Sequence, residues 1–255
     1  MSVEGIGTLK MEQTMKRWIL AAVLLNAFST YAAKEQEEMK PRFRVEASLD
    51  IAEVPSDFPV GFCLLTKGRR QYVAYYDKQH RMTVASRTTD SPQWRYQIIP
   101  SLVGWDTHNY IRLAVDDDGY LHLSGNMHGV PLIYFRSSEP WNIATFAQLS
   151  AMTGKDEKRC TYPVFMRNAD NRLIFHYRDG ESGNGNEIYN VYDLETKTWS
   201  RLMNKPLTDG EGRMNAYFLD PQRGPDGWFH IVWVWRDTAY CETNHHLSYA
   251  RSRDL

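Results

Sequence analysis

The sequence predicts an all-β protein, a β-propeller whose blades are four-stranded antiparallel sheets. Aromatic residues make up 13% of the 255 residues, with Trp 8 and Tyr 15 by count, and aromatic side chains favour strands. Four segments also repeat one pattern, an apolar strand, a tight polar turn, a second strand and a third strand that contains an aromatic residue. A four-stranded unit that recurs roughly every 50 residues is typical of a propeller blade.

The turns give the repeat its period. The turn residues are 51, 52 and 56 residues apart, at Gly68, Gly119, Asn171 and Gly227. Glycine and asparagine tolerate the positive φ that a tight hairpin turn requires. A β-sandwich with accidental spacing is the alternative, and three consecutive matches argue against it.

Each segment contributes three predicted strands. The first two segments have strands at 61–65, 72–76 and 82–87, then at 110–115, 120–124 and 132–137. The last two have strands at 162–166, 173–177 and 188–193, then at 214–219, 228–233 and 247–252. Weaker fourth strands are expected between the segments, as at 94–99.

The N-terminus has the pattern of an export signal. A short basic start at 15–18 precedes the wholly apolar run 19–25, and residues 30–32 fit a small-x-small cleavage site. The apolar run is shorter than the ~20 residues that a bilayer span needs. A buried N-terminal helix is the alternative.

We therefore expect three parts and a secreted or periplasmic protein. Residues 1–33 would hold upstream residues and a signal peptide at about 15–32, and residues 34–42 a charged leader. Residues 43–255 would form the N-terminal part of a propeller domain. The sequence stops just after a third strand, and complete propellers commonly have about six or seven blades. We expect about four blades of a longer, seven-bladed protein, with a four-bladed ring that lacks one strand as the alternative.

Charge and cysteine content exclude several classes. Lys+Arg 30 against Asp+Glu 31 gives a net charge of −1, which does not favour nucleic acid as a partner. Cys63, Cys160 and Cys241 are far apart and odd in number, so at most one pair could form a disulfide. No CxxC or CxxH spacing suggests a local zinc knuckle. No apolar run is long enough to span a membrane. The sequence does not indicate an oligomeric state.

Chemistry-bearing residues are expected to gather on one rim of the blades. The first and second strands of a blade form a hairpin, so the start of the first strand lies beside the end of the second. These positions fall at 106–110 and 126–128, at 160–162 and 177–179, and at 213–215 and 235–237, with 244–246 entering a third strand.

That rim favours proton chemistry on an anionic substrate. Histidine exchanges protons near neutral pH, and arginine holds carboxylates through paired charge-assisted hydrogen bonds. The sialidase repeat Ser-x-Asp-x-Gly-x-x-Trp has no clear copy, and no pair of carboxylates suited to a glycosidase stands out. The alternative is that these side chains merely satisfy loop backbone.

Four motifs carry a resemblance to a known family. They are WDTHNY at 105–110, GNMH at 125–128, TYP at 161–163 and YRDG at 177–180. Together they resemble the BNR-repeat seven-bladed β-propellers, and among these the ulvan lyases of polysaccharide lyase families 24 and 25. The resemblance covers roughly residues 45–255.

The resemblance implies a lyase that cleaves an anionic, uronate-containing, ulvan-like polysaccharide by β-elimination. Carried over by motif, the catalytic candidates are His108, His128, Tyr162 and Arg178. Arg178 would hold the carboxylate with one histidine assisting, His108 would be the base and Tyr162 the acid, although the histidine and tyrosine roles can be exchanged.

The same rim supplies four substrate-binding candidates, Asn109, Asn126, Arg236 and His245.

The resemblance implies no cofactor for catalysis but a structural metal, zinc or calcium. Cys241 with His245 or His246 is a candidate ligand set that is not matched to the family one by one. Two other functions stay open, a non-catalytic polysaccharide-binding propeller and a glycoside hydrolase on the same fold. A binding module would not need both His108 and His128.

Overall fold

The computed structural model of the chain describes residues 44–58 and 61–255. Its backbone separates into two units, Met1–Leu49 and Asp50–Leu255. The signal peptide and leader expected over residues 1–42 lie outside the described residues, and residues 44–49 contain no helix or strand. Within the described residues, no helix has the length and apolar character needed to cross a bilayer.

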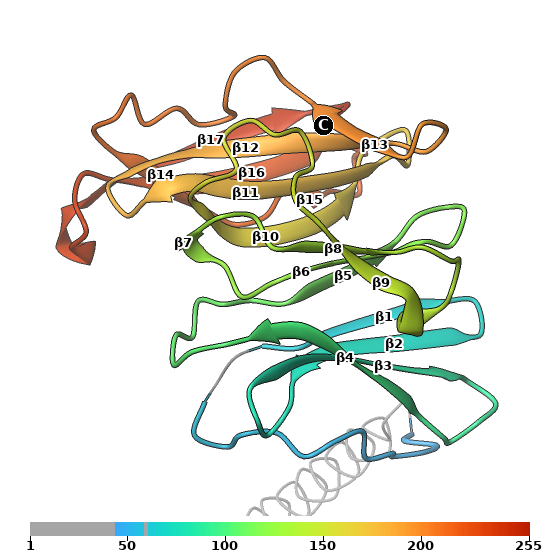
Figure 1. The fold of residues 1–255 in the computed structure, drawn as a ribbon. Helices are drawn as coiled ribbons and strands as arrows, with labels where there is room; N and C mark the ends of the chain where they lie inside the picture. The colour runs from blue at the N-terminus through green and yellow to red at the C-terminus, as the bar shows by residue number, and fades with distance from the viewer. Residues whose placement is uncertain (1–43, 59–60) are drawn as a thin grey trace, which may run out of the picture. The chain divides into compact units, whose positions relative to one another are not determined.

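Four antiparallel sheets follow one another along the second unit (Figure 1). The first has strands in the order β1 (Cys63–Lys67), β2 (Arg70–Tyr76), β3 (Arg81–Thr88) and β4 (Arg95–Leu102). The second has β5 (Arg112–Val115), β6 (Leu121–Ser124), β8 (Tyr134–Ser137) and β9 (Phe146–Leu149).

The third and fourth sheets continue the same plan. The third runs β7 (His128–Val130), β10 (Cys160–Arg167), β11 (Leu173–Glu181), β12 (Asn184–Asp193) and β13 (Thr198–Arg201). In the fourth, β16 (Phe229–Arg236) lies between β17 (Asn244–Ser252) and an inner edge made of β14 (Asn215–Phe218) and β15 (Gln222–Arg223). Two short 3₁₀ turns, η1 (Ile143–Thr145) and η2 (Cys241–Thr243), complete the elements.

Each sheet contacts the next, as propeller blades do. The inner strand β5 contacts both β1 and β10, and β12 contacts β14. The chain therefore consists of propeller blades, and the prediction of an all-β fold with four-stranded antiparallel sheets is confirmed. Every predicted strand of the four segments overlaps an observed one.

Two details depart from the regular pattern. β7 belongs by sequence to the second blade but pairs with β10 of the third, where the Gly129 amide donates to the Thr161 hydroxyl (2.8 Å). The inner strand of the fourth sheet is broken into β14 and β15 around Pro221, whose ring nitrogen has no hydrogen to donate.

The core lies between the sheets. Tyr72, Ala74 and Tyr76 alternate along β2 and face Leu121 and Leu123 of the second sheet in one buried cluster. This alternation places every second side chain on one face, as the strand period requires. A second cluster fills the space between the second and third sheets in the same way. Packing between blades therefore fixes the positions of the strand ends.

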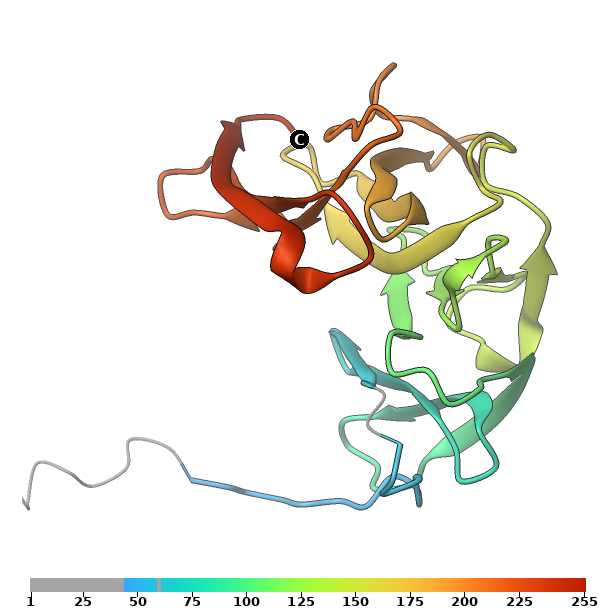
Figure 2. The same cartoon turned by 90° about the vertical axis from the view of Figure 1, so that its left-hand side faces the viewer.

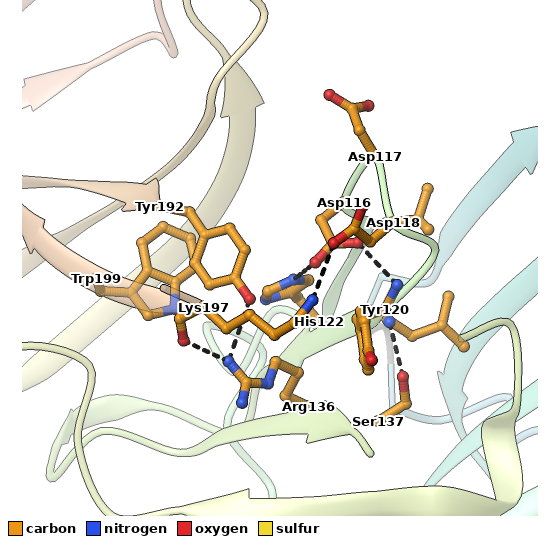
Figure 3. Close-up of polar contacts among 12 residues, drawn as sticks. Asp116, Asp117, Asp118, Tyr120, His122, Arg136, Ser137, Tyr192, Lys197 and Trp199 are labelled. Carbon is orange, nitrogen blue, oxygen red and sulfur yellow. Dashed lines mark hydrogen bonds and ion pairs between the residues drawn. The ribbon is translucent and has the colours of Figure 1, made fainter. Parts of the chain in front are cut away.

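Polar contacts join the second and third sheets at the β5–β6 turn (Figure 3). The ring of buried His122 faces the Asp116 carboxylate at 3.4 Å. Arg136 donates to the Tyr192 hydroxyl (3.1 Å) and to the Lys197 carbonyl (2.6 Å). Lys197 Nζ also donates to the Asp118 carboxylate of the turn (2.9 Å), so the turn is joined to the third sheet.

Candidate functional site

The strand register places the predicted site residues on one rim. Across the β10–β11 ladder, Cys160 pairs with Asp179 and Thr161 with Arg178, so the start of β10 lies beside the end of β11. β7 brings His128 next to Thr161. Figure 2 faces this rim. The expectation that strand starts and ends meet on this rim is confirmed.

Tyr162 is positioned by an irregularity in β10. The ladder shifts register between Thr161 and Val164, and Tyr162 adopts a left-handed backbone with φ +57°. A bulge of this kind redirects a side chain out of the normal alternation. The Tyr162 ring stacks on Tyr110 with centroids 5.6 Å apart and lies 6.0 Å from the His108 ring.

The two histidines form a stacked pair on a shared carboxylate. The rings of His108 and His128 lie 4.6 Å apart. Asp106 Oδ1 is 2.7 Å from His108 Nδ1, and its Oδ2 is hydrogen-bonded to His128 Nδ1. A carboxylate at Nδ1 favours the tautomer with the proton there, which leaves Nε2 of a neutral imidazole as an acceptor. Either histidine can therefore accept a proton at Nε2.

Asp106 is built to remain ionised. Partial burial alone would raise its pKa, but hydrogen bonds from the His108 amide (2.9 Å) and from the His128 and His108 rings lower the pKa to about 2. Sequence reasoning missed Asp106 as a functional residue. Its spacing two residues before His108, on the same loop, is the feature that could have identified it.

The same three side chains are a candidate metal centre. Among residues 44–58 and 61–255, Asp106, His108 and His128 are the one group of three ligand atoms lying within 4.8 Å of one another. Two imidazoles and a carboxylate match the donors of a three-ligand zinc site. Within the described residues, no comparable group of ligand atoms forms around Cys241. The structural zinc expected at Cys241 therefore stays a prediction.

Arg178 is buried at the base of the rim. It is 4% exposed, and its guanidinium carbon lies 4.9 Å from the centre of the Tyr162 ring. Its Nη1 donates to the Tyr217 hydroxyl at 3.3 Å. These residues line a cavity of about 300 Å³ together with Tyr110, Arg112 and Asp220. The cavity is large enough for a sugar ring, with a guanidinium at its wall.

Tyr217 is a second residue that sequence reasoning missed. Burial would raise the pKa of its phenol, but the Ser182 hydrogen bond (2.7 Å) and the nearby Arg178 and Arg236 lower it below its usual value. The guanidinium carbon of Arg236 lies 3.7 Å from the centre of the Tyr217 ring. The Ala-Tyr-Phe run of β14 looks like an ordinary strand, so only the neighbouring guanidiniums identify this phenol.

The four substrate-binding candidates fall in different environments. Arg236 reaches the cavity wall through Tyr217. The Asn109 amide donates to the Asp106 carbonyl (3.1 Å), and the Asn126 amide donates to the Leu102 carbonyl (3.0 Å), so both brace loops. His245 Nε2 lies 2.9 Å from Asp237, outside the residues that line the cavity. Binding roles for these four residues stay predictions.

The chain belongs to the BNR repeat-containing family, whose model matches residues 70–255. Among curated proteins it is similar to several named ulvan lyase, long isoform. The one from Glaciecola sp. (strain KUL10) is 44% identical over 44 residues, 17% of this chain and 4% of that protein. The one from Pseudoalteromonas sp. (strain PLSV) is 45% identical over 42 residues, 16% of this chain and 4% of that protein.

Solved structures share the fold. The polysaccharide lyase Uly1 has a TM-score of 0.63 and 18% identity, with 84% of this chain and 57% of that chain covered. A PL25 ulvan lyase bound to a glucuronate-containing saccharide has a TM-score of 0.52 and 16% identity, with 73% of this chain and 46% of that chain covered. The chain thus spans less than two thirds of these relatives.

Proposed function

We propose that the chain carries the active site of a secreted polysaccharide lyase that cleaves a uronate-containing, ulvan-like polysaccharide by β-elimination. The observation that supports this most is the joint placement of a histidine pair, a phenol and a buried guanidinium beside one cavity. The short curated matches and the shared fold agree with a lyase. Export rests on the N-terminal sequence pattern alone.

Arg178 would bind the carboxylate of the uronic acid. Its guanidinium is almost fully buried, and charge-assisted hydrogen bonds are stronger where water is excluded. Binding the carboxylate as an ion pair stabilises the negative charge that develops when the C5 proton leaves. Arg178 therefore acts on the acidity of the substrate and on its position.

His108 would remove the C5 proton and Tyr162 would protonate the leaving oxygen. His108 Nε2 takes the proton, the C5–H electron pair forms the C4=C5 double bond, and the C4–O bond breaks. Burial raises the pKa of Tyr162, so its phenol holds the proton that the leaving oxygen needs. Tyr217, whose pKa is lowered, is less suited to keep a proton. His128, which is hydrogen-bonded to the Asp106 carboxylate as His108 is, would assist Arg178 in binding the substrate carboxylate.

One assay separates the candidate functions. The purified chain is incubated with ulvan and with other uronate polymers, and unsaturated product is followed by ultraviolet absorbance. A lyase gives rising absorbance, a hydrolase on this fold gives new reducing ends without it, and a binding module gives neither. Tyr162→Phe is the matched control, since it removes only the proton donor and should remove the signal.

The assay is repeated after treatment with a chelator, because Asp106, His108 and His128 match a zinc donor set. The base role proposed for His108 requires a free Nε2, so activity should survive chelation. Loss of activity at an unchanged unfolding midpoint, with recovery on adding zinc, would show that a metal bound by Asp106, His108 and His128 acts in place of a histidine base.

A further inference from the structure

A second cavity lies on the rim opposite the candidate site. It has a volume of about 320 Å³ and is lined by the start of β2, the end of β3, the β3–β4 turn and Trp141 of the β8–β9 loop. The β1–β2 and β3–β4 turns define this rim, whereas Tyr162 and Arg178 lie at the other ends of their strands. The two cavities have no lining residue in common.

This cavity is positively charged. Arg70, Arg87 and Arg95 line it, and no carboxylate is among its lining residues. Asp90, in the adjoining turn, is ion-paired with Arg69 instead. Arg70 and Arg95 are exposed, so their guanidiniums are open to a ligand. The local charge therefore favours an anion.

Two indole rings support the guanidiniums. The carbon of the Arg70 guanidinium lies 4.8 Å from the centre of the Trp141 ring, and that of Arg87 lies 5.1 Å from the centre of the Trp94 ring. A guanidinium stacked on an aromatic face is held flat, with its N–H groups directed outward from its edge. Flat apolar rings beside fixed donors are the surroundings that a sugar ring with charged substituents requires.

Two buried donors in this cavity lack acceptors. Arg87 Nε and Trp94 Nε1 have no hydrogen-bond partner in the part of the chain that the structure describes. Arg87 is nevertheless fixed, because its Nη1 donates to the Ser91 carbonyl at 2.8 Å. Neither atom is open to solvent, so the contacts with a ligand are assigned to the exposed guanidiniums of Arg70 and Arg95.

We propose that the cavity is a second polysaccharide-binding site, which takes a sugar residue carrying a sulfate or carboxylate group. The guanidiniums of Arg70 and Arg95 pair with the anionic group, and the indoles contact the ring. The polymeric nature of the ligand rests on the proposed function. The protein then binds polysaccharide at two places, in this cavity and at the candidate site on the opposite rim.

Affinity electrophoresis of the whole chain tests this proposal, with dextran sulfate in the gel and neutral dextran in a parallel gel. The variant Arg70→Gln/Arg95→Gln removes two exposed guanidiniums from the cavity. The matched control is Arg251→Gln/Arg253→Gln, which removes the same charge and two Arg–Trp contacts at Trp228 (4.3 and 4.6 Å). Thermal unfolding verifies that both variants are folded.

We expect dextran sulfate, but not dextran, to retard the wild type. The apparent Kd should rise about tenfold or more in the cavity variant, as for loss of one or more charge-assisted hydrogen bonds, and less than about twofold in the control. Equal loss in both variants, equal retardation by neutral dextran, or complete competition by sodium sulfate at matched ionic strength would each overturn the proposal.

The absorbance assay keeps the two proposals distinguishable. If unsaturated product forms but retardation does not depend on Arg70 and Arg95, only this inference fails. If retardation depends on them but no uronate polymer yields product, only the proposed function fails.

Discussion

At the scale of single residues, the carboxylate of Asp106 contacts both histidine rings, so one substitution affects two candidate groups at once. Asp106→Asn keeps the size of the side chain but removes the charge and one acceptor. The one remaining oxygen can accept from only one of the two Nδ1 protons, and loss of the charge weakens the preference of both rings for the tautomer with a free Nε2. We expect kcat to fall by a factor of about 10² to 10⁴ with KM little changed.

A matched control for this substitution exists on the fourth sheet. Asp226 Oδ1 lies 3.0 Å from His230 Nε2, so Asp226→Asn breaks a similar surface pair away from the rim. Its kcat should stay within about twofold of wild type, as for most surface changes. Equal losses in Asp106→Asn and Asp226→Asn would contradict the role given to Asp106.

His108→Ala and Arg178→Ala should both abolish turnover, but for different reasons. Loss of the base should lower the rate by a factor on the order of 10² to 10⁴ while leaving binding largely intact. Loss of Arg178 should weaken binding as well, since hydrogen bonds to charged groups contribute about 1.5–3 kcal/mol each. Calorimetry of binding beside the absorbance assay distinguishes the two. Near-normal rates for His108→Ala on every uronate polymer would refute the lyase assignment.

At the scale of elements, strands β11 and β12 bury an ionisable pair beneath the rim. His176 Nδ1 lies 2.8 Å from Glu187 Oε1, and both side chains are buried. Burial lowers the pKa of His176 to about 3. Burial also raises the pKa of Glu187 well above its usual value, although Arg178 opposes this. The pair therefore favours a neutral histidine beside a protonated carboxyl.

This pair should limit stability at both ends of the pH scale. The contribution of His176 is present above pH 6.5, the pKa of the unfolded chain, and is lost as pH falls toward 3. The contribution of Glu187 is full below pH 4.5 and is lost as pH rises through its raised pKa. The effects oppose each other between these values, so the unfolding midpoint should fall below pH 4.5 and above pH 6.5.

Glu187→Gln should remove the decline of the unfolding midpoint above pH 6.5 and keep the decline below pH 4.5. Thermal unfolding at pH values on both sides of this range measures the two declines. Glu181→Gln, at the exposed end of β11, is the control and should keep both declines. An unchanged alkaline decline in Glu187→Gln would show that this carboxyl is not the group responsible.

The sequence predicted most elements because their cues are local. Gly68, Gly119 and Asn171 mark hairpin turns, and all three have the positive φ that such turns need. β7 was not predicted, because its partner β10 lies in another blade and three residues carry no periodic pattern. The histidines and Arg178 were found by motif, whereas Asp106 and Tyr217 matter through contacts that only the folded chain creates.

At the scale of the whole molecule, apolar side chains lie open on the first and fourth sheets. Leu64 on β1 is 63% exposed, and Leu247 and Tyr249 on β17 are 79% and 57% exposed. Exposed apolar strand faces favour association between copies. We expect the purified chain to associate as its concentration rises, which light scattering after size exclusion measures.

Lysine at two of these positions tests that expectation. Leu247→Lys/Tyr249→Lys should reduce association and lower the unfolding midpoint only slightly, because neither side chain is in the core and the lost contact is that of Tyr249 with His230. Gln148→Lys/Ser150→Lys adds the same charge at exposed positions on and just after β9 and should change association far less. If both double variants stay equally associated, the apolar surface of β17 is not the cause.

The left-handed backbone of Tyr162 sets the role proposed for this residue against the stability of the fold. A tyrosine in this conformation costs about 1–3 kcal/mol, whereas glycine adopts it freely. Tyr162→Gly should therefore relieve strain, offset in part by the lost ring contacts with Tyr110 and Arg178, yet should form no product. An unfolding midpoint at or above that of the wild type, together with no turnover, would show that Tyr162 costs stability and would support its proposed role as the acid.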